Sequence, residues 1–387
     1  MPSALFKRAS YPTLEHGVYF NQAALGLIGQ PAVEAMHAFL DTVARHGSLR
    51  MSDTEEATYA EALRARAARL LHAEAARIAI VGGASELLGQ LPLLLQPGSG
   101  STILAVSSDF PAVTRPWLRY AAQTGCTVRF VDDTPAYDLT DVLLDTLDAR
   151  TAVVAVSSVQ YATGTRVDIP RLRAVTAPLG VSLIVDATQA AGALRVDTTR
   201  WDVDVIVTSG YKWLGGHGGV ALAVIAPDLL VHTPPLPGWM GAPDPFAFDA
   251  TRLLLAEDAR RYTQSTMSYV SMAGLTAALD ALLALDADRL EAHARALAAQ
   301  LIDGVAAYGW HPFRRLDDAA AAPHIISLAH PTLKAEATAT ALRRDHIVCG
   351  ARLGRLRISL APYNDDQDID ALIDAFARQR ADADFGF

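Results

Sequence analysis

The chain has 387 residues, of which 51% are hydrophobic and 19% are charged, and its formal net charge at pH 7 is −9. This length suffices for one large and one smaller domain, each with its own buried core. The acidic balance argues against nucleic acid or an anionic membrane surface as the main partner, because both attract basic proteins.

The beginning of the chain and its two cysteines indicate the compartment. The opening residues M-P-S-A-L-F-K-R lack the apolar core of a signal peptide, and the longest apolar runs are shorter than a membrane span. We therefore expect a cytoplasmic protein with no membrane partner. Cys126 and Cys349 are too few for a disulfide framework, and each lies in an apolar, strand-like stretch. We expect buried thiols and no metal site.

The first third of the chain contains helical patterns and then a buried strand. Residues 31–76 are rich in Ala, Glu, Arg and Leu at helical spacing, which predicts two long helices with charged outer faces. Residues 78–81 form an apolar strand, two glycines follow, and Ala84 and Ser85 open a helix that should reach Leu94. A helix N-terminus fed by glycines is an anion site, because its N–H groups are free. Ser85 as an ordinary helix cap remains compatible with this interpretation.

Strands and helices then alternate. Residues 102–106 form a strand, which is followed by Phe110 and by a helix expected to start at Pro116. Residues 153–157 form another apolar strand, which runs into a loop that contains Tyr161. This repeated pattern predicts a mostly parallel sheet with right-handed connections.

Two further strands end in residues that carry chemistry. Residues 181–185 are an almost wholly apolar strand that ends in Asp186, and a helical piece is expected near Thr188. Residues 204–208 form the next strand, which ends in the sequence S-G-Y-K with Lys212 as its last residue. Since α/β proteins bind ligands outside the carboxyl ends of their strands, both charged residues should face one site.

This pair of residue types suits pyridoxal phosphate (PLP) chemistry. The cofactor needs a lysine amine to form a Schiff base and a carboxylate to keep its pyridine nitrogen protonated. Lys212 and Asp186 would serve. For the pair alone, an Asp that caps a helix and a Lys that pairs with it is a simpler alternative.

The sequences around the pair decide between these alternatives. V-D-A-T-Q at 185–189 and T-S-G-Y-K-W-L-G at 208–215 resemble the class V aminotransferase family of fold-type I PLP enzymes, which includes cysteine desulfurases, kynureninase and isopenicillin N epimerase-like proteins. The resemblance implies that Lys212 carries the cofactor, that Asp186 faces the pyridine nitrogen and that Gln189 bonds the ring hydroxyl. It also implies an α/β fold whose large domain holds a mostly parallel seven-stranded sheet between helices, with a small α+β C-terminal domain.

The same resemblance implies a division of the chain and further cofactor contacts. The large PLP-binding domain should span 20–265, and the small domain should span 266–387 together with 1–19. The turn at Ala84 and Ser85 should hold the cofactor phosphate, although Ala84 stands where relatives often have a hydroxyl residue. The remaining residues expected to touch the cofactor are Phe110 over the ring, Tyr161 near the ring hydroxyl, and Ser209 and Tyr211 beside the lysine. For Phe110 and Tyr161, ordinary packing residues remain the alternative.

Three more segments resemble parts of the family's site. Y-F-N-Q-A-A-L-G at 19–26 puts Ala24 at the edge of the substrate pocket. R-R-Y-T-Q-S-T at 260–266 puts Thr266 on the PLP phosphate of a partner subunit, which implies a homodimer with shared sites, although Ser265 replaces the family's usual glycine. The late R-x-S motif puts Arg357 on the substrate carboxylate. An edge-strand arginine that faces solvent is the alternative for Arg357.

We therefore expect a PLP-dependent enzyme that acts on an α-amino acid. Among the possible reactions, the aminotransfer of a class V aminotransferase is the first expectation. C–S lyase chemistry by β-elimination and amino-acid epimerisation remain open, because they use the same lysine base. A desulfurase that carries sulfur on a mobile cysteine is not favoured, since residues 350–355 contain none. A nucleotide-binding protein with 215–219 as its phosphate loop is also disfavoured, because an apolar strand-like run follows these glycines.

Overall fold

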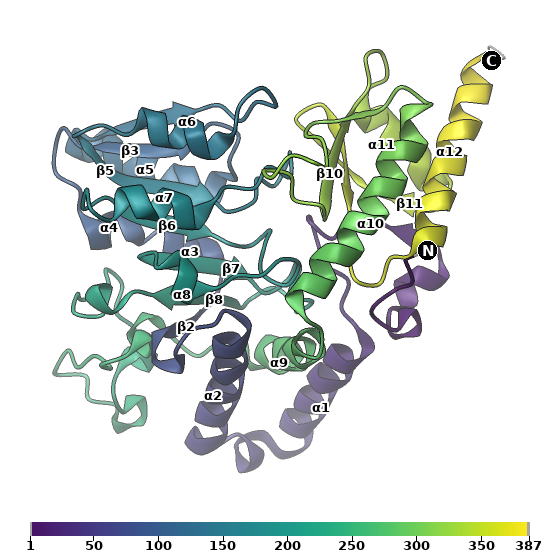
Figure 1. Cartoon of the computed structure of the whole chain (residues 1–387). Helices are drawn as coiled ribbons and strands as arrows, with labels where there is room; N and C mark the ends of the chain where they lie inside the picture. The colour runs from purple at the N-terminus through teal and green to yellow at the C-terminus, as the bar shows by residue number, and fades with distance from the viewer. Residues whose placement is uncertain (1, 385–387) are drawn as a thin grey trace.

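A seven-stranded sheet is the centre of the larger part of the computed structural model, which describes residues 2–384 (Figure 1). Strand β8 runs antiparallel to both of its neighbours, and every other adjacent pair runs parallel. The predicted α/β fold with a mostly parallel seven-stranded sheet is therefore confirmed. In order across the sheet the strands are β2 (Ile78–Val81), β8 (Ala221–Ile225), β7 (Val205–Ser209), β6 (Ser182–Asp186), β5 (Thr151–Ser157), β3 (Thr102–Val106) and β4 (Thr127–Val131).

Helices cover both faces of this sheet, as its apolar strands require. Along β6, Leu183 and Val185 belong to one hydrophobic core and Ile184 to the other, so successive residues alternate between two buried faces. The first core also takes residues from α2 (Asp53–Leu70), α6 (Leu139–Thr146), α7 (Ile169–Thr176), α8 (Thr198–Trp201) and α9 (Tyr269–Leu283). The second takes residues from α3 (Ala84–Leu88), α4 (Leu91–Leu95) and α5 (Pro111–Thr124).

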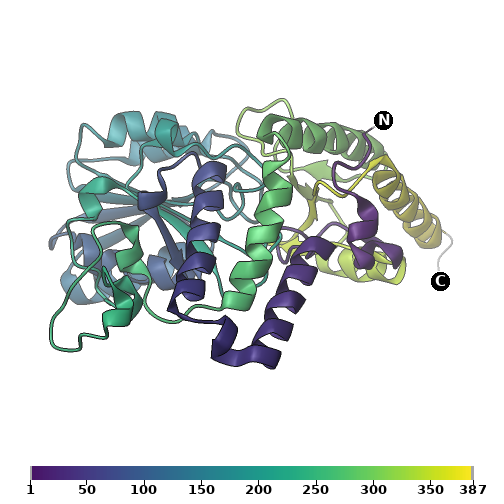
Figure 2. The same cartoon turned by 90° about the horizontal axis from the view of Figure 1, so that it is seen from below.

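A second, smaller sheet forms the other part of the molecule (Figure 2). It is antiparallel throughout and has the order β12 (Gly350–Arg352), β13 (Arg355–Ser359), β10 (Ile325–Ala329), β9 (His311–Pro312). Its core includes residues of α10 (Ala287–Ala306), α11 (Ala335–Arg344) and α12 (Asp366–Asp384). The N-terminal strand β1 (Val18–Tyr19) pairs with β11 (Ile347–Val348), and Arg8 donates a hydrogen bond of 2.7 Å to Asp368 of α12.

The helices predicted over residues 31–76 are α1 (Gln30–His46) and α2. Both pack against α9. The division into 20–265 and 266–387 with 1–19 stays a prediction, and α9 lies in the second range while it packs on helices of the first. Short 3-10 helices occupy Arg8–Ser10, Pro12–Glu15, Gly47–Arg50, Ala75–Arg77, Pro227–Leu229, Trp239–Gly241, Pro245–Ala247 and Ala259–Tyr262.

Three local predictions were wrong. The segment after Asp186 makes turns and no helix, because the Thr188 N–H bonds the Asp186 carboxylate at 2.8 Å and Gly192 then takes a φ of 92°. The helix expected to reach Leu94 is divided into α3 and α4, since proline at 92 has no N–H to bond the carbonyl of Leu88 and fits only the first turn of a new helix. Helix α5 starts at Pro111 rather than at 116, because proline suits the first helical turn.

Within residues 2–384 no single helix is long and apolar enough to cross a membrane, and α9 and α10 meet the requirement only as a pair bent by 81°. Much of α9 is buried in the protein core, including Met272, Leu275 and Leu279.

Candidate active site

Lys212 and Asp186 come together at the carboxyl ends of neighbouring parallel strands. Asp186 is the last residue of β6, and Lys212 follows β7 by three residues. Both side chains are buried. Burial lowers the pKa of Lys212 to about 8, with further lowering by Arg357 and Arg352, while Asp186 opposes this shift. Burial likewise raises the pKa of Asp186, and the hydrogen bonds from Thr188 and the charge of Lys212 oppose that shift.

Two aromatic rings form a wall beside the lysine. The Nζ of Lys212 lies 5.2 Å from the ring centre of Phe110 and 5.8 Å from that of Tyr211. The Phe110 ring is 38% exposed, so a flat ligand can reach it, and it meets the Tyr161 ring edge-on at 5.4 Å. The structure thus brings Phe110, Tyr161 and Tyr211 to the same site as Lys212.

A buried carboxylate that the sequence analysis missed fixes this wall. Asp109 accepts hydrogen bonds from the N–H groups of Phe110 at 2.6 Å and Ser157 at 2.7 Å, and from the amide of Gln160 at 3.2 Å. Burial raises the pKa of Asp109 to about 6, against the effect of these hydrogen bonds. Asp109 therefore joins the segment after β3 to the segment after β5. Its position next to Phe110 was the only available signal.

The N-terminal loop packs directly on the lysine backbone. Gln22 donates a hydrogen bond of 2.9 Å to the Lys212 carbonyl, and the Gly26 N–H donates one of 2.9 Å to the Tyr211 carbonyl. Ala24 lies between these two contacts and is half-buried. The loop that was expected to edge the substrate pocket therefore also holds the lysine.

Gln189 is held by three parts of the chain. Its amide nitrogen donates to the Ala23 carbonyl at 3.0 Å, and its amide oxygen accepts from the Trp213 indole at 2.7 Å. One amide N–H stays available for a ligand, since a glutamine amide has two. His324, which sequence analysis did not single out, donates from Nε2 to the Gln189 carbonyl at 2.6 Å. Burial lowers the pKa of His324 to about 4, so its ring is neutral at pH 7.

The turn after β2 keeps free donors for an anion. No side chain caps the N-terminus of α3, where Ala84 is buried and Ser85 is exposed. Glu86 accepts the Gly82 N–H at 3.0 Å, which fixes the turn. Ser209 is buried at the end of β7, and its backbone N–H donates to the Thr188 hydroxyl at 3.1 Å.

Thr266 is not brought into the site within one chain. It is exposed, and the hydrogen bonds among residues 2–384 include none from its hydroxyl. Its backbone carbonyl accepts a bond of 3.4 Å from Ser265. The nearby Thr263 instead turns inward and donates to the Ile80 carbonyl at 2.8 Å.

Arg357 reaches the site from the smaller sheet. It is 1% exposed, and it donates two hydrogen bonds, one of 2.8 Å to the Tyr161 carbonyl and one of 3.5 Å to the side-chain oxygen of Asn21. Its Nε is buried with no hydrogen-bond partner within the described part of the chain, and no carboxylate there pairs with it. Burial and the charge of Arg352 lower the pKa of Arg357 to about 10. A buried guanidinium without an anion is costly, so this position favours an anionic ligand.

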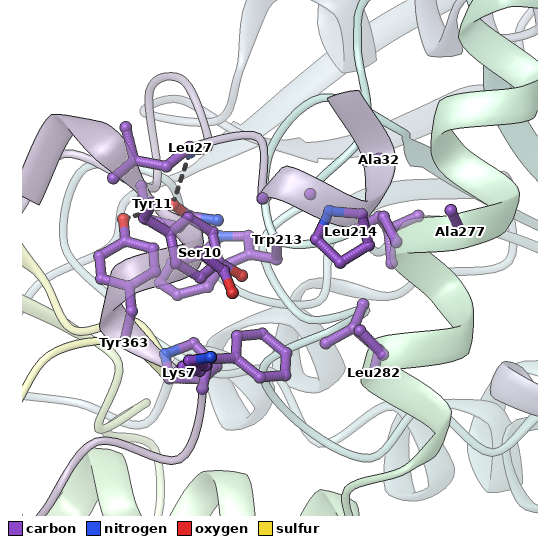
Figure 3. A pocket seen from close by; sticks show the side chains of 18 residues that line it. Lys7, Ser10, Tyr11, Leu27, Ala32, Trp213, Leu214, Ala277, Leu282 and Tyr363 are labelled. Atoms are coloured by element: carbon purple, nitrogen blue, oxygen red, sulfur yellow. Dashed lines mark hydrogen bonds between the residues drawn. The ribbon is translucent and has the colours of Figure 1, made fainter. Parts of the chain in front are cut away.

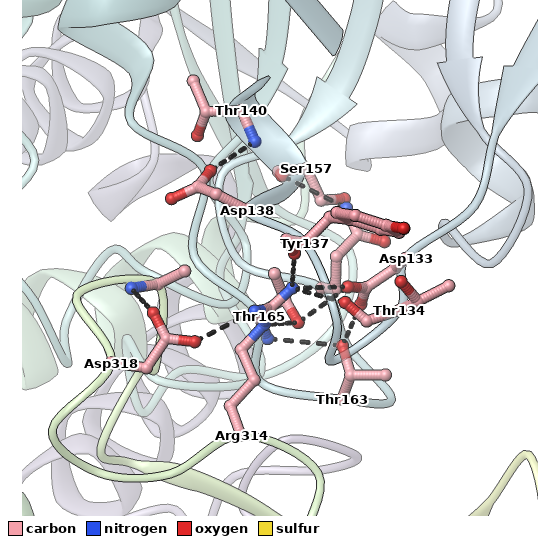
Figure 4. A network of polar contacts seen from close by, with 12 residues as sticks. Asp133, Thr134, Tyr137, Asp138, Thr140, Ser157, Thr163, Thr165, Arg314 and Asp318 are labelled. Carbon is pink, nitrogen blue, oxygen red and sulfur yellow. Dashed lines mark hydrogen bonds and ion pairs between the residues drawn. The ribbon is translucent and has the colours of Figure 1, made fainter. Parts of the chain in front are cut away.

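A polar network positions the loop that Arg357 contacts (Figure 4). Arg314, from the smaller part, donates to Thr165 at 2.8 Å and to Asp133 at 3.2 Å. Asp133 also accepts from the Thr163 hydroxyl at 2.6 Å. Because Thr163 and Thr165 follow Tyr161 closely in sequence, Arg314 fixes the Tyr161 loop between the two parts of the molecule.

A separate cavity of about 200 Å³ is lined in part by Trp213 and Leu214, which follow Lys212 in the chain (Figure 3). Lys7 and Tyr363 line it at one side, and Ala277 and Leu282 of α9 line the other. Neither Lys212 nor Asp186 lines this cavity, so it is distinct from the candidate active site.

Comparisons with known proteins agree with this geometry. The family model for aminotransferase class-V matches residues 18–372. The chain belongs to the aminotransferase class-V family. Enzymes of this family use PLP, and the chain is a PLP-dependent enzyme acting on amino acids.

Individual class-V relatives match over almost their full lengths. The chain is 24% identical over 375 residues to the uncharacterized aminotransferase YcbU of Bacillus subtilis, which covers 96% of each chain. It is 29% identical over 394 residues to cysteine desulfurase CsdA of Escherichia coli, again with 96% of each covered. A structure of the cystine C–S lyase C-DES has a TM-score of 0.87 at 23% identity and covers 95% of this chain and 99% of that one, which shows a shared fold.

Neither cysteine of this class-V chain is placed for sulfur transfer. Cys349 is buried after β11, and burial raises the pKa of its thiol to about 12. Cys126 is buried in the large part, where its thiol contacts the Pro97 carbonyl at 3.3 Å. The prediction that both thiols are buried is confirmed.

The sequence analysis disfavoured a nucleotide-binding loop at residues 215–219, because a strand-like run follows them. In the structure this glycine-rich turn does lead into a strand, β8, and not into a helix.

Proposed function

We propose that Lys212 carries PLP and that the protein is an aminotransferase for an α-amino acid. One observation carries this proposal: a buried lysine amine faces an accessible phenyl ring and lies at the end of the strand beside a buried aspartate. PLP supplies the electron sink for such chemistry when it is bound. The residues of the chain must then hold the cofactor, bind the substrate and move a proton.

The polar groups of the site fit the cofactor. The Asp186 carboxylate would hold the proton on the pyridine nitrogen, because Thr188 keeps it oriented and burial strengthens the interaction. The free N–H of the Gln189 amide suits the ring hydroxyl, and Phe110 offers its face for stacking. The groups that would hold the phosphate are the uncapped N–H groups at Ala84 and Ser85. Ser209 and Tyr211, which precede Lys212 at the end of β7, would add further cofactor contacts.

Lys212 would move the proton at the substrate α-carbon. A base works best when its pKa lies near the operating pH, and a pKa of about 8 meets this condition far better than an ordinary lysine does. The residue expected over the cofactor ring is Phe110, which cannot carry a proton, so this work falls to Lys212.

Arg357 would bind the substrate carboxylate. Its guanidinium is buried, and its Nε has no hydrogen-bond partner among the described residues. Its positive charge lowers the pKa of Lys212, so the guanidinium lies close enough to act on the lysine amine. A planar fork matches a carboxylate with two parallel hydrogen bonds. Ala24, in the loop that Gln22 and Gly26 anchor, would edge the same pocket.

We infer further that the enzyme is a homodimer in which Thr266 of one subunit meets the phosphate in the other. Thr266 is exposed, and an aromatic cluster lies on the same long connection. In this cluster Trp239 is 39% and Phe248 is 70% exposed, and their rings stack at 5.9 Å. Exposed aromatic residues are typical of protein interfaces. The two free cysteines fit a reducing compartment, so we place the enzyme in the cytoplasm.

Two other reactions use the same groups. A C–S lyase needs the same lysine base and no protein thiol, and an epimerase differs only in how the proton returns. A panel of L-amino acids distinguishes them when keto acid, sulfide, the D-enantiomer and the amine form of PLP are measured separately. Aminotransfer is expected to yield keto acid and the amine form together. Sulfide without the amine form would replace our proposal by C–S lyase activity.

The role of Arg357 is tested with the same panel. Arg357→Ala should keep its PLP and lose at least about tenfold in kcat/KM for α-amino acids, because a charge-assisted fork is removed. Arg355→Ala is the matched control, since Arg355 lies two residues away on β13 and stacks on Phe313 instead. Equal losses in both variants would contradict the assignment.

A further inference from the structure

Three arginines share one face of the hairpin formed by β12 and β13. Gly350 pairs with Arg357 and Arg352 pairs with Arg355 across the antiparallel ladder. Directly opposed residues, and residues two apart on a strand, lie on the same face. The opposite face carries Leu356 and a neighbouring isoleucine, both buried in the core of the smaller part. The arginine face therefore turns away from that core.

None of these arginines forms an ion pair with a carboxylate in the part of the chain that the structure describes. Arg355 stacks on Phe313, whose ring centre lies 4.7 Å from its guanidinium carbon, while its Nε is buried without a hydrogen-bond partner among the described residues. Arg357 bonds the Tyr161 carbonyl. Arg352 is half-buried, and its hydrogen bond of 2.7 Å goes only to the carbonyl of the preceding residue.

The charge of Arg352 reaches both the Lys212 amine and the Arg357 guanidinium. Its positive charge lowers the pKa of both Lys212 and Arg357. It is the diagonal neighbour of Arg357 on the ladder, at a typical Cα separation of roughly 7–8 Å, which long side chains can bridge. Two guanidinium groups on the same face of the hairpin thus act on the Lys212 amine.

The two carboxylates described in the candidate active site, Asp186 and Asp109, are already engaged. Asp186 lies at the end of β6, where it would serve the cofactor. Asp109 accepts the hydrogen bonds of Phe110, Ser157 and Gln160 described above. One substrate carboxylate would neutralise Arg357 and would leave Arg352 without an anion.

We propose that Arg352 binds a second acidic group, so that the substrate is an α-amino acid whose side chain ends in a carboxylate or a sulfinate. The inference rests on the proposed role of Arg357 and adds the substrate class. Arg352 is then the residue that selects acidic over neutral side chains, because a neutral amide or alkyl group would leave its charge unpaired.

Equilibrium binding tests this without turnover. Isothermal calorimetry on the PLP-loaded enzyme should show that succinate and glutarate bind at least about tenfold more tightly than butyrate and valerate, which have the same chain lengths and one carboxylate fewer. Arg352→Met should remove this preference and leave butyrate binding unchanged. Arg352→Lys should restore part of it, and Arg355→Met should keep it in full.

Kinetics on the same preparations supply the second readout. Aspartate, glutamate or cysteine sulfinate should exceed asparagine and glutamine in kcat/KM at least about tenfold in the wild type, and Arg352→Met should narrow this ratio mainly through KM. Equal binding of succinate and butyrate to the wild type would overturn the inference. If Lys212 did not hold PLP the proposed function would fall, whereas PLP-loaded enzyme without a dicarboxylate preference would refute the role of Arg352 alone.

Discussion

Gly26 lies so close to the backbone of Lys212 that a Cβ added to Gly26 would come within 2.2 Å of the Lys212 carbonyl oxygen. The contact is between backbone groups, so neither side can rotate away. Gly26→Ala should therefore shift the lysine and destabilise the protein by about 1–3 kcal/mol, as overpacking of a close contact does. Thermal unfolding and the PLP content after dialysis measure both effects.

Gly98→Ala is the matched control, because no atom lies within 4 Å of a Cβ built there. We expect this control to unfold and to retain PLP as the wild type does. A Gly26→Ala protein with wild-type stability and full PLP content would show that the loop does not hold the lysine.

The pKa of Lys212 gives a pH dependence with a definite sign. Only the neutral amine can attack the PLP aldehyde, and burial lowers the pKa of Lys212 from 10.5 to about 8. The rate of PLP uptake by cofactor-free protein should rise with pH through about 8 and then level off. Arg352→Met should move this midpoint upward, because it removes a charge that disfavours the ammonium form. A midpoint near 10 in the wild type would contradict the buried position of the amine.

Asp186→Asn separates the charge of this residue from its shape. Asparagine keeps an acceptor for the Thr188 N–H but cannot stabilise a protonated pyridine nitrogen. We expect turnover to fall by about two to three orders of magnitude or more, a loss of the size seen when a preorganised electrostatic group is removed. Single-turnover kinetics with PLP-saturated protein provide the measurement. Wild-type rates would place the partner of the pyridine nitrogen elsewhere.

Arg314→Met should affect both stability and substrate binding. The variant leaves the Asp133 carboxylate, whose side chain is fully buried, without its Arg314 counter-ion, which typically costs about 3–5 kcal/mol. It also frees the loop that holds Tyr161, so KM for the amino acid should rise while PLP is retained. Urea unfolding and steady-state kinetics measure the two effects.

Arg129→Met is the control for Arg314→Met. Arg129 pairs with Asp148, both side chains are one-third exposed, and such pairs contribute about 0–1 kcal/mol. A rise in KM of the same size in both variants would show that the Arg314 network has no special relation to the site.

The sequence identified the parts of the site that depend on strand order. Asp186 and Lys212 follow apolar strands that neighbour each other, and the carboxyl ends of parallel strands meet at one edge. Phe110 and Tyr161 follow two further strands of the same sheet, and the structure brings both beside Lys212, while their contacts with the cofactor stay a prediction. Arg357 was found from its motif and from the oddity of an arginine inside an apolar strand.

Contacts between distant segments could not be predicted in this way. Gln22 reaches Lys212 across 190 positions, and Arg314 reaches Thr165 across 149. Their side chains are ordinary polar residues in sequence, and only the folded arrangement makes them partners. The prediction of a helix after Asp186 failed for a local reason. The Thr188 N–H bonds the Asp186 side chain and therefore does not continue a helix.

The most direct measurement is the location of the cofactor on the chain. Protein purified with PLP should be yellow, and borohydride should bleach it by reducing the link between lysine and cofactor. Peptide mass spectrometry should then place one pyridoxyl group on Lys212, and Lys212→Ala should carry none. A pyridoxyl group on Lys7 or Lys334, or protein that never takes up PLP, would contradict the central claim.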